Sequence, residues 1–216
     1  MTFIAIAGNI GAGKTRLAHV LSEALGFDHY AEHVDPDILD RFYHQMETYA
    51  FSTQYHFVTT RYNDILKGKT SGRNFVTDRT PYEDVHVFVP LLQEGGFLNE
   101  RQVQDIQTLF EHLYFSAYPS SLTLLPPDLL IFLSTTRRSL EERIRQRRRA
   151  FEAALLNPEN PYLDEINTRL DAWFSSLRGV NTLAIESDTL DLVSNREDIE
   201  RTVALVRDAL VGDRGA

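Results

Sequence analysis

The sequence contains no cysteine and no excess of positive charge, and these absences exclude several classes of protein. With 216 residues and zero Cys, the chain has neither a disulfide framework nor a thiolate metal site. Its 22 Lys and Arg are outnumbered by 31 Asp and Glu, which gives a formal net charge of −9. This charge argues against a general affinity for nucleic acid or anionic membranes. We therefore expect no nucleic acid and no membrane as partner.

Long apolar runs, internal repeats and low-complexity linkers are also missing. No stretch approaches the roughly 20 apolar residues that a membrane span needs. The N-terminal apolar run is too short for a signal peptide, so we expect a cytoplasmic protein. A hydrophobic content of 43% and the chain length suit one α/β domain over residues 1–216.

What the sequence does contain begins with a phosphate-binding motif. A short apolar run, residues 3–7, leads directly into Gly-Asn-Ile-Gly-Ala-Gly-Lys-Thr at 8–15, which is the P-loop pattern G-x-x-x-x-G-K-[ST]. The motif lies between a predicted strand and a predicted helix over Thr15 to Leu25, closed by Gly26. The glycines let backbone N–H groups converge on phosphate oxygens, Lys14 would reach the β- and γ-phosphates, and Thr15 would hold Mg²⁺. The predicted ATP-binding residues of this loop are Gly8, Asn9, Ile10, Gly11, Ala12, Gly13, Lys14 and Thr15.

Five short apolar segments predict the strands of a parallel sheet. They lie near residues 2–7, 27–32, 75–78, 129–133 and 181–185. We expect helices between them: a stretch over 37–67, whole or broken, one from the capping box at 80–83, one over 97–118, one after Thr135 or Thr136, and one over 198–210. This alternation predicts a three-layer α/β/α sandwich.

Charged residues follow two of the predicted strands. Glu32 ends the second strand and Asp78-Arg79 ends the third, where open parallel sheets bind their ligands. Glu32 is either a surface loop acid or a general base. Asp78 and Arg79 are either a simple ion pair or part of a phosphate and metal site, and we favour the second interpretation because a helix starts directly after them.

A second set of polar residues recurs at helical spacing. Tyr43, Glu47, Ala50, Gln54 and Arg61 are three, four or seven residues apart and are expected to share one face. Such a stripe is usually solvated. Gln54 and Arg61, however, lie among aromatic residues, as expected of a site that hydrogen-bonds a planar ligand.

An arginine-rich segment follows the fourth predicted strand. It contains Arg143, Arg145, Arg147, Arg148 and Arg149. A solvated helix and a nucleic-acid patch are alternative interpretations, and the acidic chain argues against the patch. In a P-loop protein an arginine cluster can close over the transferring phosphoryl group, so we predict a lid over about residues 137–152.

Taken in order, these motifs resemble the deoxynucleoside kinase family over most of the chain. Ala31-Glu32-His33-Val34 corresponds to the family's Glu-Pro-Val, with His33 in place of Pro, and Asp78-Arg79-Thr80 corresponds to Asp/Glu-Arg-Ser. Tyr43 and Gln54 have the family's spacing. Residues 143–152 match the lid pattern R-x-x-x-R-x-R-x-x-E, with Arg148 in place of a common Gly. The bacterial deoxyadenosine and deoxyguanosine kinases are the most similar type.

The resemblance implies roles for residues of the acceptor site. Glu32 would take the 5′-hydroxyl proton, and Arg79 would bind near that hydroxyl and the donor phosphate. Tyr43 and Glu152 would hold the sugar 3′-hydroxyl. Gln54 would pair with the base edge, and Phe88, one turn after Asp84, would stack on the base.

For the donor site, the resemblance implies ATP and Mg²⁺. Thr15 and Asp78 would assist the metal, and the lid arginines on ATP would be Arg143, Arg147 and Arg149. Relatives are commonly dimers built through helices, so a homodimer is implied, and the helix over 97–118 is a candidate face.

Arg61 and Asp84 indicate the accepted base. They resemble the polar pair of family members that accept purines or cytosine, whereas thymidine-accepting relatives carry apolar residues at both places. A buried guanidinium and carboxylate must be paired, or they cost several kcal/mol. A base that presents an amino donor and a ring-nitrogen acceptor can share such a pair. The sequence leaves adenine and guanine open.

We therefore expect ATP-dependent phosphorylation of the 5′-hydroxyl of deoxyadenosine or deoxyguanosine, with deoxycytidine as a further candidate, in nucleotide salvage. A nucleoside monophosphate kinase similar to thymidylate kinase is the alternative, because it shares the P-loop, the Asp-Arg strand end and the lid. A regulatory NTP-binding switch is disfavoured, because no Asn-Lys-x-Asp-like signature is present and the lid arginines have no clear use in one.

Overall fold

The computed structural model describes residues 1–32, 35–115 and 126–212, so His33 and the end of the predicted 97–118 helix lie outside the described residues. Within them, the sheet has parallel strands in the order β2-β3-β1-β4-β5. Their bounds are β1 (Phe3–Gly8), β2 (Asp28–Tyr30), β3 (Phe75–Thr77), β4 (Leu129–Ser134) and β5 (Thr182–Glu186). The five predicted strands are confirmed, with ends that differ by at most two residues.

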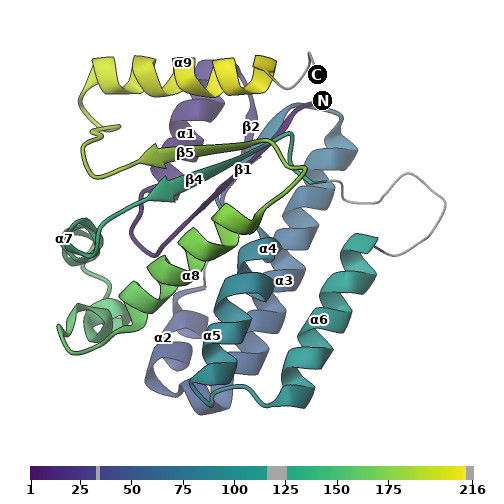
Figure 1. Ribbon diagram of the computed structural model, residues 1–216, viewed down its shortest axis with the longest axis vertical. Helices are drawn as coiled ribbons and strands as arrows, with labels where there is room; N and C mark the ends of the chain where they lie inside the picture. The colour runs from purple at the N-terminus through teal and green to yellow at the C-terminus, as the bar shows by residue number, and fades with distance from the viewer. Residues whose placement is uncertain (33–34, 116–125, 213–216) are drawn as a thin grey trace.

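Helices cover both faces of the sheet (Figure 1). Strand β1 alternates: Phe3, Ala5 and Ala7 belong to one hydrophobic cluster, whereas Ile4 and Ile6 belong to the other. The Ile4 side packs on α1 (Lys14–Leu25), α7 (Arg137–Arg147) and α9 (Arg196–Gly212). The Phe3 side packs on α3 (Met46–Ser71), α6 (Glu100–Phe115) and α8 (Tyr162–Ser176). The predicted three-layer α/β/α fold is therefore confirmed.

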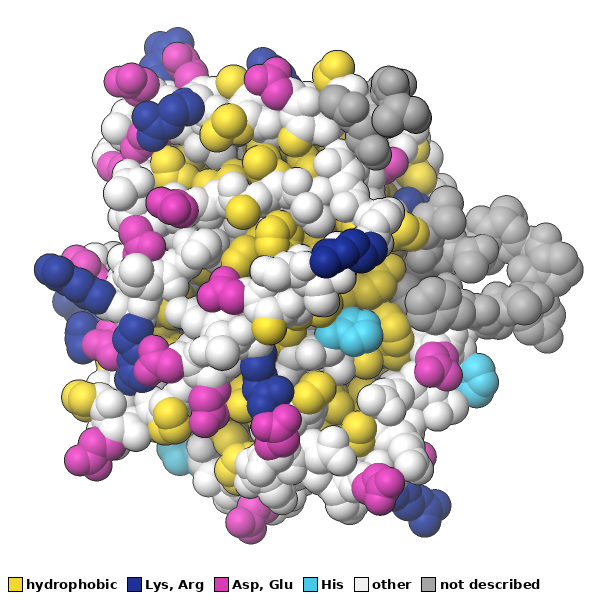
Figure 2. Space-filling view, in the orientation of Figure 1, with side chains coloured by type: hydrophobic (Ala, Val, Ile, Leu, Met, Phe, Trp, Pro, Cys, Tyr) yellow, Lys and Arg dark blue, Asp and Glu magenta, His cyan; other side chains and the backbone are white. Residues whose placement is uncertain are grey.

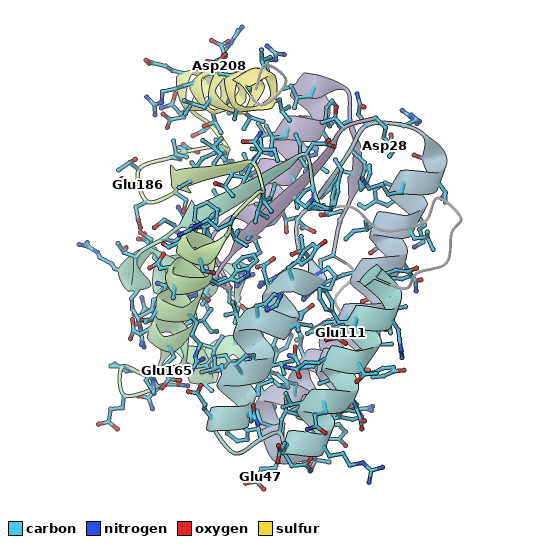
Figure 3. All side chains as sticks on the ribbon, turned by 45° about the vertical axis from the view of Figure 1, so that its right-hand side comes forward. Asp28, Glu47, Glu111, Glu165, Glu186 and Asp208 are labelled. Atoms are coloured by element: carbon cyan, nitrogen blue, oxygen red, sulfur yellow. The ribbon has the colours of Figure 1, made fainter. Side chains whose placement is uncertain are left out.

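The stretch predicted as helical over 37–67 is broken. It forms α2 (Pro36–His44) and α3, separated by Gln45, whose φ of −143° and ψ of 61° are not helical. Tyr43 therefore lies on a different helix from Gln54 and Arg61, and the prediction of one shared face was wrong across this break. Glu47 lies in the first turn of α3 and is exposed, at the end of the helix that points away from the sheet (Figure 3).

The segment after β3 contains a turn of π-helix that the sequence analysis did not predict. The chain runs through α4 (Pro81–Glu83), the π-helical η1 (Asp84–Phe88) and α5 (Val89–Glu94). Pro90 has no N–H and cannot donate to the preceding turn. The Val89 N–H donates to the Asp84 carbonyl instead, which widens the helix. Asp84 and Phe88 are both buried on this wide turn.

Two further helices differ from the prediction. Helix α6 begins three residues later than expected, because Asn99 and Gln102 exchange side chain to backbone hydrogen bonds of 3.0 and 2.9 Å at its start. Helix α8 was missed. Its buried residues Leu163, Ile166, Leu170 and Trp173 have helical spacing, which was the signal available in the sequence.

The arginine-rich segment is also not one helix. Thr136, and not Thr135, is the N-cap of α7. The helix ends at Arg147, Arg148 adopts a left-handed conformation with φ 53°, and a 3₁₀ helix, η2 (Ala150–Leu156), follows. Glu152 therefore lies on η2 and comes back toward the arginines of α7.

Charged side chains of both signs lie on the face seen in Figure 2. Basic and acidic side chains are interspersed there and do not gather into one basic patch. None of the described helices is both long and apolar enough to cross a membrane.

Candidate active site

A cavity of about 810 Å³ brings together most of the predicted site residues. Residues of the P-loop, the ends of β2 and β3, helix α3, the π-turn and the lid all line it. The predicted residues on its wall are Ile10, Gly11, Ala12, Gly13, Lys14, Thr15, Glu32, Tyr43, Gln54, Arg61, Arg79, Asp84, Phe88, Arg143, Arg147, Arg149 and Glu152. Gly8, Asn9 and Asp78 are not among the lining residues.

The P-loop is shaped by its glycines. Gly13 has a φ of 100° at the start of α1, a conformation that side-chain-bearing residues rarely adopt. At Gly8, with a φ of 148°, an added Cβ would lie 3.0 Å from the Leu133 carbonyl oxygen. Lys14 lies across the loop and donates from Nζ to the carbonyls of Gly8 and Asn9 at 2.8 and 2.7 Å. The first N–H groups of an α-helix have no intrahelical acceptor and carry a partial positive charge, which suits the start of α1 to an anion.

Asn9 links the P-loop to α8 through hydrogen bonds of its side chain. Its Nδ2 donates to the Leu163 carbonyl at 2.8 Å and to Asn167 Oδ1 at 2.6 Å, both on α8. Its Oδ1 accepts from the Ile10 N–H at 2.6 Å. Asn167 Nδ2 in turn donates to the Thr135 carbonyl at 2.9 Å. The unpredicted helix α8 therefore ties the P-loop to the end of β4.

Arg79 connects the P-loop with the second strand end. Its Nη1 donates to the Gly8 carbonyl at 3.3 Å and to Glu83 Oε2 at 3.0 Å, and its Nε lies 3.7 Å from Glu32 Oε2. Glu83 is fully buried, accepts from the Gly8 N–H at 3.3 Å, and accepts from the Thr80 N–H at 3.2 Å. The Arg79 guanidinium also lies 5.2 Å from the Phe88 ring centroid.

Arg61 continues this chain of charges to the far end of the cavity. Its guanidinium contacts the Glu32 carboxylate through Nη2 and the Asp84 carboxylate through Nη1. It stacks over the Phe57 ring with 4.5 Å between Cζ and the ring centroid. Among the described residues, Asp84 Oδ2 and Gln54 Oε1 are buried and find no hydrogen-bond donor. Gln54, Arg61 and Asp84 all line the cavity, so two buried acceptors without donors lie in the residues around one guanidinium.

These charges shift one another's proton affinity. Burial, with Arg79 nearby, lowers the pKa of Lys14 to about 7. Burial alone would raise the pKa of Glu32, but Arg61 and Arg79 outweigh it and lower that pKa to about 2. Burial raises the pKa of Asp84 to about 6 even though Arg61 opposes the shift. At neutral pH both carboxylates are ionised, and Lys14 is poised between its two charge states.

Asp78 contacts the backbone of Glu32. Its Oδ1 accepts from the Glu32 N–H at 2.7 Å, and its side chain is buried. It borders a small hollow of about 10 Å³ that Glu32, Arg61 and Arg79 also line. Asp78 thus fixes the backbone that carries Glu32, and its predicted role at a metal stays a prediction.

The lid is already linked to the P-loop. Arg143 Nη1 donates to the Ala12 carbonyl and to Ser187 Oγ, both at 2.9 Å. Glu152 is buried, and its carboxylate lies 3.2 Å from Arg147 and 3.6 Å from Arg149. Tyr43 stacks on Phe151 with ring centroids 6.1 Å apart. The turn at Arg148 is what brings Glu152 next to the two arginines.

Several lining residues were not singled out by the sequence analysis. Phe57 lines the cavity, whereas Glu83 does not line it but contacts Arg79 and the Gly8 N–H. Tyr162 lies on the missed helix, and Ser187 with residues 190–193 follows β5. Phe57 could have been found, because it lies three residues after Gln54 and four before Arg61 on the same helix face.

Comparisons with known proteins fit this geometry. A family model described as "Deoxynucleoside kinase" matches residues 4–211. The chain is 30% identical over 203 residues to a deoxyadenosine/deoxycytidine kinase of Bacillus subtilis, which covers 94% of this chain and 90% of the relative. It is 30% identical to a deoxyguanosine kinase of Lactobacillus johnsonii, with 92% of this chain and 88% of the relative covered.

The fold has counterparts among solved structures. A deoxyadenosine kinase from M. mycoides with the products dCMP and dCDP bound superposes with a TM-score of 0.76 and 23% identity, over 96% of this chain and 100% of that one. The same kinase with dATP bound also gives a TM-score of 0.76, at 22% identity. The match of the family model over almost the whole chain, together with these relatives, shows that the protein belongs to the deoxynucleoside kinase family.

Proposed function

We propose that the protein transfers the γ-phosphoryl group of ATP to the 5′-hydroxyl of a purine deoxynucleoside or deoxycytidine, in nucleotide salvage. The observation that carries the proposal is the continuous chain of contacts from Gly8 through Arg79 and Glu32 to Arg61 and Asp84. It joins a triphosphate site at one end to a pocket for a planar polar ligand at the other. Glu32 stands at the junction, where a 5′-hydroxyl would meet the γ-phosphate.

In this reaction the 5′-oxygen forms a bond to the γ-phosphorus while the bond from that phosphorus to the ADP oxygen breaks. Glu32 takes the hydroxyl proton, and Arg79 and Lys14 stabilise the charge that moves to the leaving oxygen. Arg143, Arg147 and Arg149 surround the donor phosphates from the lid. Most of the acceleration then comes from positioning and preorganised charge.

Magnesium fits the donor side of the cavity. Thr15 lines the cavity at the start of α1, and within residues 1–32, 35–115 and 126–212 no cluster of three His, Asp or Glu forms a separate metal cage. Mg²⁺ usually has only one or two protein ligands and is otherwise bound by the substrate phosphates and water. When bound, it neutralises phosphate charge. Thr15 would hold it, and Asp78 would act through Glu32 or water.

The choice of base rests on the unpaired acceptors. Asp84 Oδ2 and Gln54 Oε1 require donors, and an amino group of adenine, guanine or cytosine supplies one. The Bacillus relative is named for deoxyadenosine and deoxycytidine, and the Lactobacillus relative for deoxyguanosine. These names support the same group of acceptors.

The test is incubation with Mg·ATP and each of the four deoxynucleosides, followed by chromatography of the products. We expect a 5′-monophosphate from deoxyadenosine, deoxyguanosine or deoxycytidine, and little from thymidine. Deoxynucleoside monophosphates are tested in parallel. Turnover of monophosphates alone would favour a thymidylate-kinase-like enzyme, and ATP hydrolysis without any phosphorylated acceptor would favour a nucleotide switch.

We also propose a homodimer. The candidate helix α6 buries Val103, Ile106 and Phe110 inward, so an interface on its outer side would be polar. Sedimentation equilibrium measures the mass directly, and a single 24.8 kDa species would contradict the proposal.

A further inference from the structure

One guanidinium holds two carboxylates that belong to different parts of the site. Arg61, on α3, contacts Glu32 after β2 and Asp84 on the π-turn. The Arg61 side chain is 7% exposed, and that of Asp84 is 1% exposed. In this structure Glu32, assigned to proton removal, is therefore in contact with Arg61, assigned to reading the base.

A nucleobase competes for this guanidinium. A base that donates to Asp84 Oδ2 or Gln54 Oε1 places its ring-nitrogen acceptor next to Arg61, because amino group and ring nitrogen are adjacent on adenine and cytosine. Arg61 can then exchange its contact with Glu32 for one with the base, since a guanidinium has five donors in a fixed plane. A buried charge that loses its partner is strongly destabilised. Glu32 does not lose its last partner, because Arg79 Nε remains 3.7 Å away.

We propose that Arg61 is a positioning residue that holds the Glu32 carboxylate until a nucleobase engages Arg61 and Asp84, so that base recognition controls the rate of phosphoryl transfer as well as affinity. This inference rests on the proposed function. It differs from simple base reading, in which a poorly matched base binds weakly but reacts at the normal rate once it is bound.

The experiment compares two acceptors at saturation in single-turnover measurements. One is the best natural deoxynucleoside. The other is benzimidazole 2′-deoxyriboside, which fills a purine-sized pocket but has neither the amino group nor the six-membered-ring nitrogens. We expect wild-type protein to transfer phosphate to the natural acceptor at least about tenfold faster than to the analogue, a difference in rate constant and not in KM.

Removing the link should abolish that difference. In Arg61→Met the rates for the two acceptors should agree within about twofold, because Glu32 is no longer held in either case. Arg61→Met leaves Asp84 buried without its cation, so the double variant Arg61→Met/Asp84→Leu is measured as well and keeps the test valid if the single variant unfolds. Arg169→Met is the matched control. Arg169 pairs with Glu94 away from the cavity, and this variant should keep the tenfold difference.

Two results would overturn the inference: equal transfer rates for both acceptors in wild-type protein, or a tenfold difference that persists in the double variant. Failure of wild-type protein to phosphorylate any natural deoxynucleoside is a different result, because it contradicts the proposed function itself.

Discussion

Single residues in the cavity owe their chemistry to the charges beside them. Glu32 illustrates this, because burial and two arginines act on it in opposite directions and the arginines prevail. Its carboxylate is only partly exposed, and Asp78 fixes its backbone. Under the proposed function this fixed geometry would let Glu32 receive the 5′-hydroxyl proton.

Replacing Glu32 should separate turnover from binding. Glu32→Gln keeps the shape but removes the proton acceptor, so kcat should fall by about 10²–10⁴-fold. The acceptor Kd should change by no more than about threefold. Steady-state kinetics and calorimetric titration measure the two quantities. Glu94→Gln, at an exposed position, is the matched control. Equal losses in kcat and affinity would argue against a base.

Lys14 should make nucleotide binding depend on pH. Its pKa of about 7 means that the free protein loses this charge as pH rises, whereas bound phosphates favour the charged form. Binding then takes up a proton, and ATP affinity should fall by up to about tenfold per pH unit above pH 8, where ATP itself is fully ionised. Titrations between pH 8 and 9.5 measure this. Lys14→Arg stays charged and should give a flat profile, so matching slopes in the two proteins would refute the assignment.

The sequence predicted these residues because motifs specify chemistry locally. It predicted less well which of two neighbouring carboxylates contacts the P-loop. Asp78 and Glu83 both flank the start of one helix, and only the packed structure turns Glu83 toward Gly8 and Asp78 toward the Glu32 backbone. That choice depends on long-range packing, which a local pattern does not contain.

Among the elements, the lid shows how one backbone conformation sets a site. Arg148 has a φ of 53°, and this left-handed turn separates α7 from η2. The resemblance to related kinases indicates Gly at this position, and the observed conformation explains why. A side-chain-bearing residue is strained by about 1–2 kcal/mol there, whereas glycine is not.

Arg148→Gly should therefore stabilise the protein. The strain relieved exceeds the added freedom of glycine in the unfolded chain, so we expect a net gain of about 0.5–1 kcal/mol in the free energy of unfolding. Urea denaturation measures it. Arg148→Ala retains the Cβ and should show no such gain. A glycine variant less stable than the alanine variant would show that the Arg148 side chain contributes contacts that outweigh the strain.

Element predictions were incomplete where a short feature redirects the chain, and the prediction over 37–67 had left open whether that stretch is whole or broken. Gln45 divides a continuous helical pattern, and Pro90 widens a turn without changing the hydrophobic spacing around it. Helix α8 was missed although its apolar residues have regular spacing. The strands were predicted well because a buried parallel strand is a compact apolar run bounded by turns.

For the whole molecule, the buried charges of the cavity should appear in acid stability. Glu32 has a folded pKa of about 2 against an ordinary value of 4.5, so its contribution is present above pH 4.5 and is lost as pH falls toward 2. That contribution is about 3 kcal/mol. Asp84 acts in the opposite sense between about pH 6 and 3.8, because burial raises its pKa.

Comparing wild-type protein with Glu32→Gln isolates the contribution of Glu32. The wild-type advantage in urea unfolding at pH 6 should shrink by roughly 2.5 kcal/mol by pH 2.5, with the remainder lost as pH falls through 2. An advantage that stays constant over this range would mean that Arg61 and Arg79 do not hold the carboxylate ionised in the folded protein.

The order of the sheet also has a consequence for synthesis on the ribosome. The strand that leads into the P-loop is made first, yet it is the central strand, and its partners are Phe75 and its neighbours on one side and Leu129 and its neighbours on the other. The nascent P-loop therefore cannot be fastened until β4 has left the exit tunnel, and α8, which holds Asn9, emerges later still. The nucleotide site, whose phosphate loop precedes the other four strands, is completed only after α8 has been made.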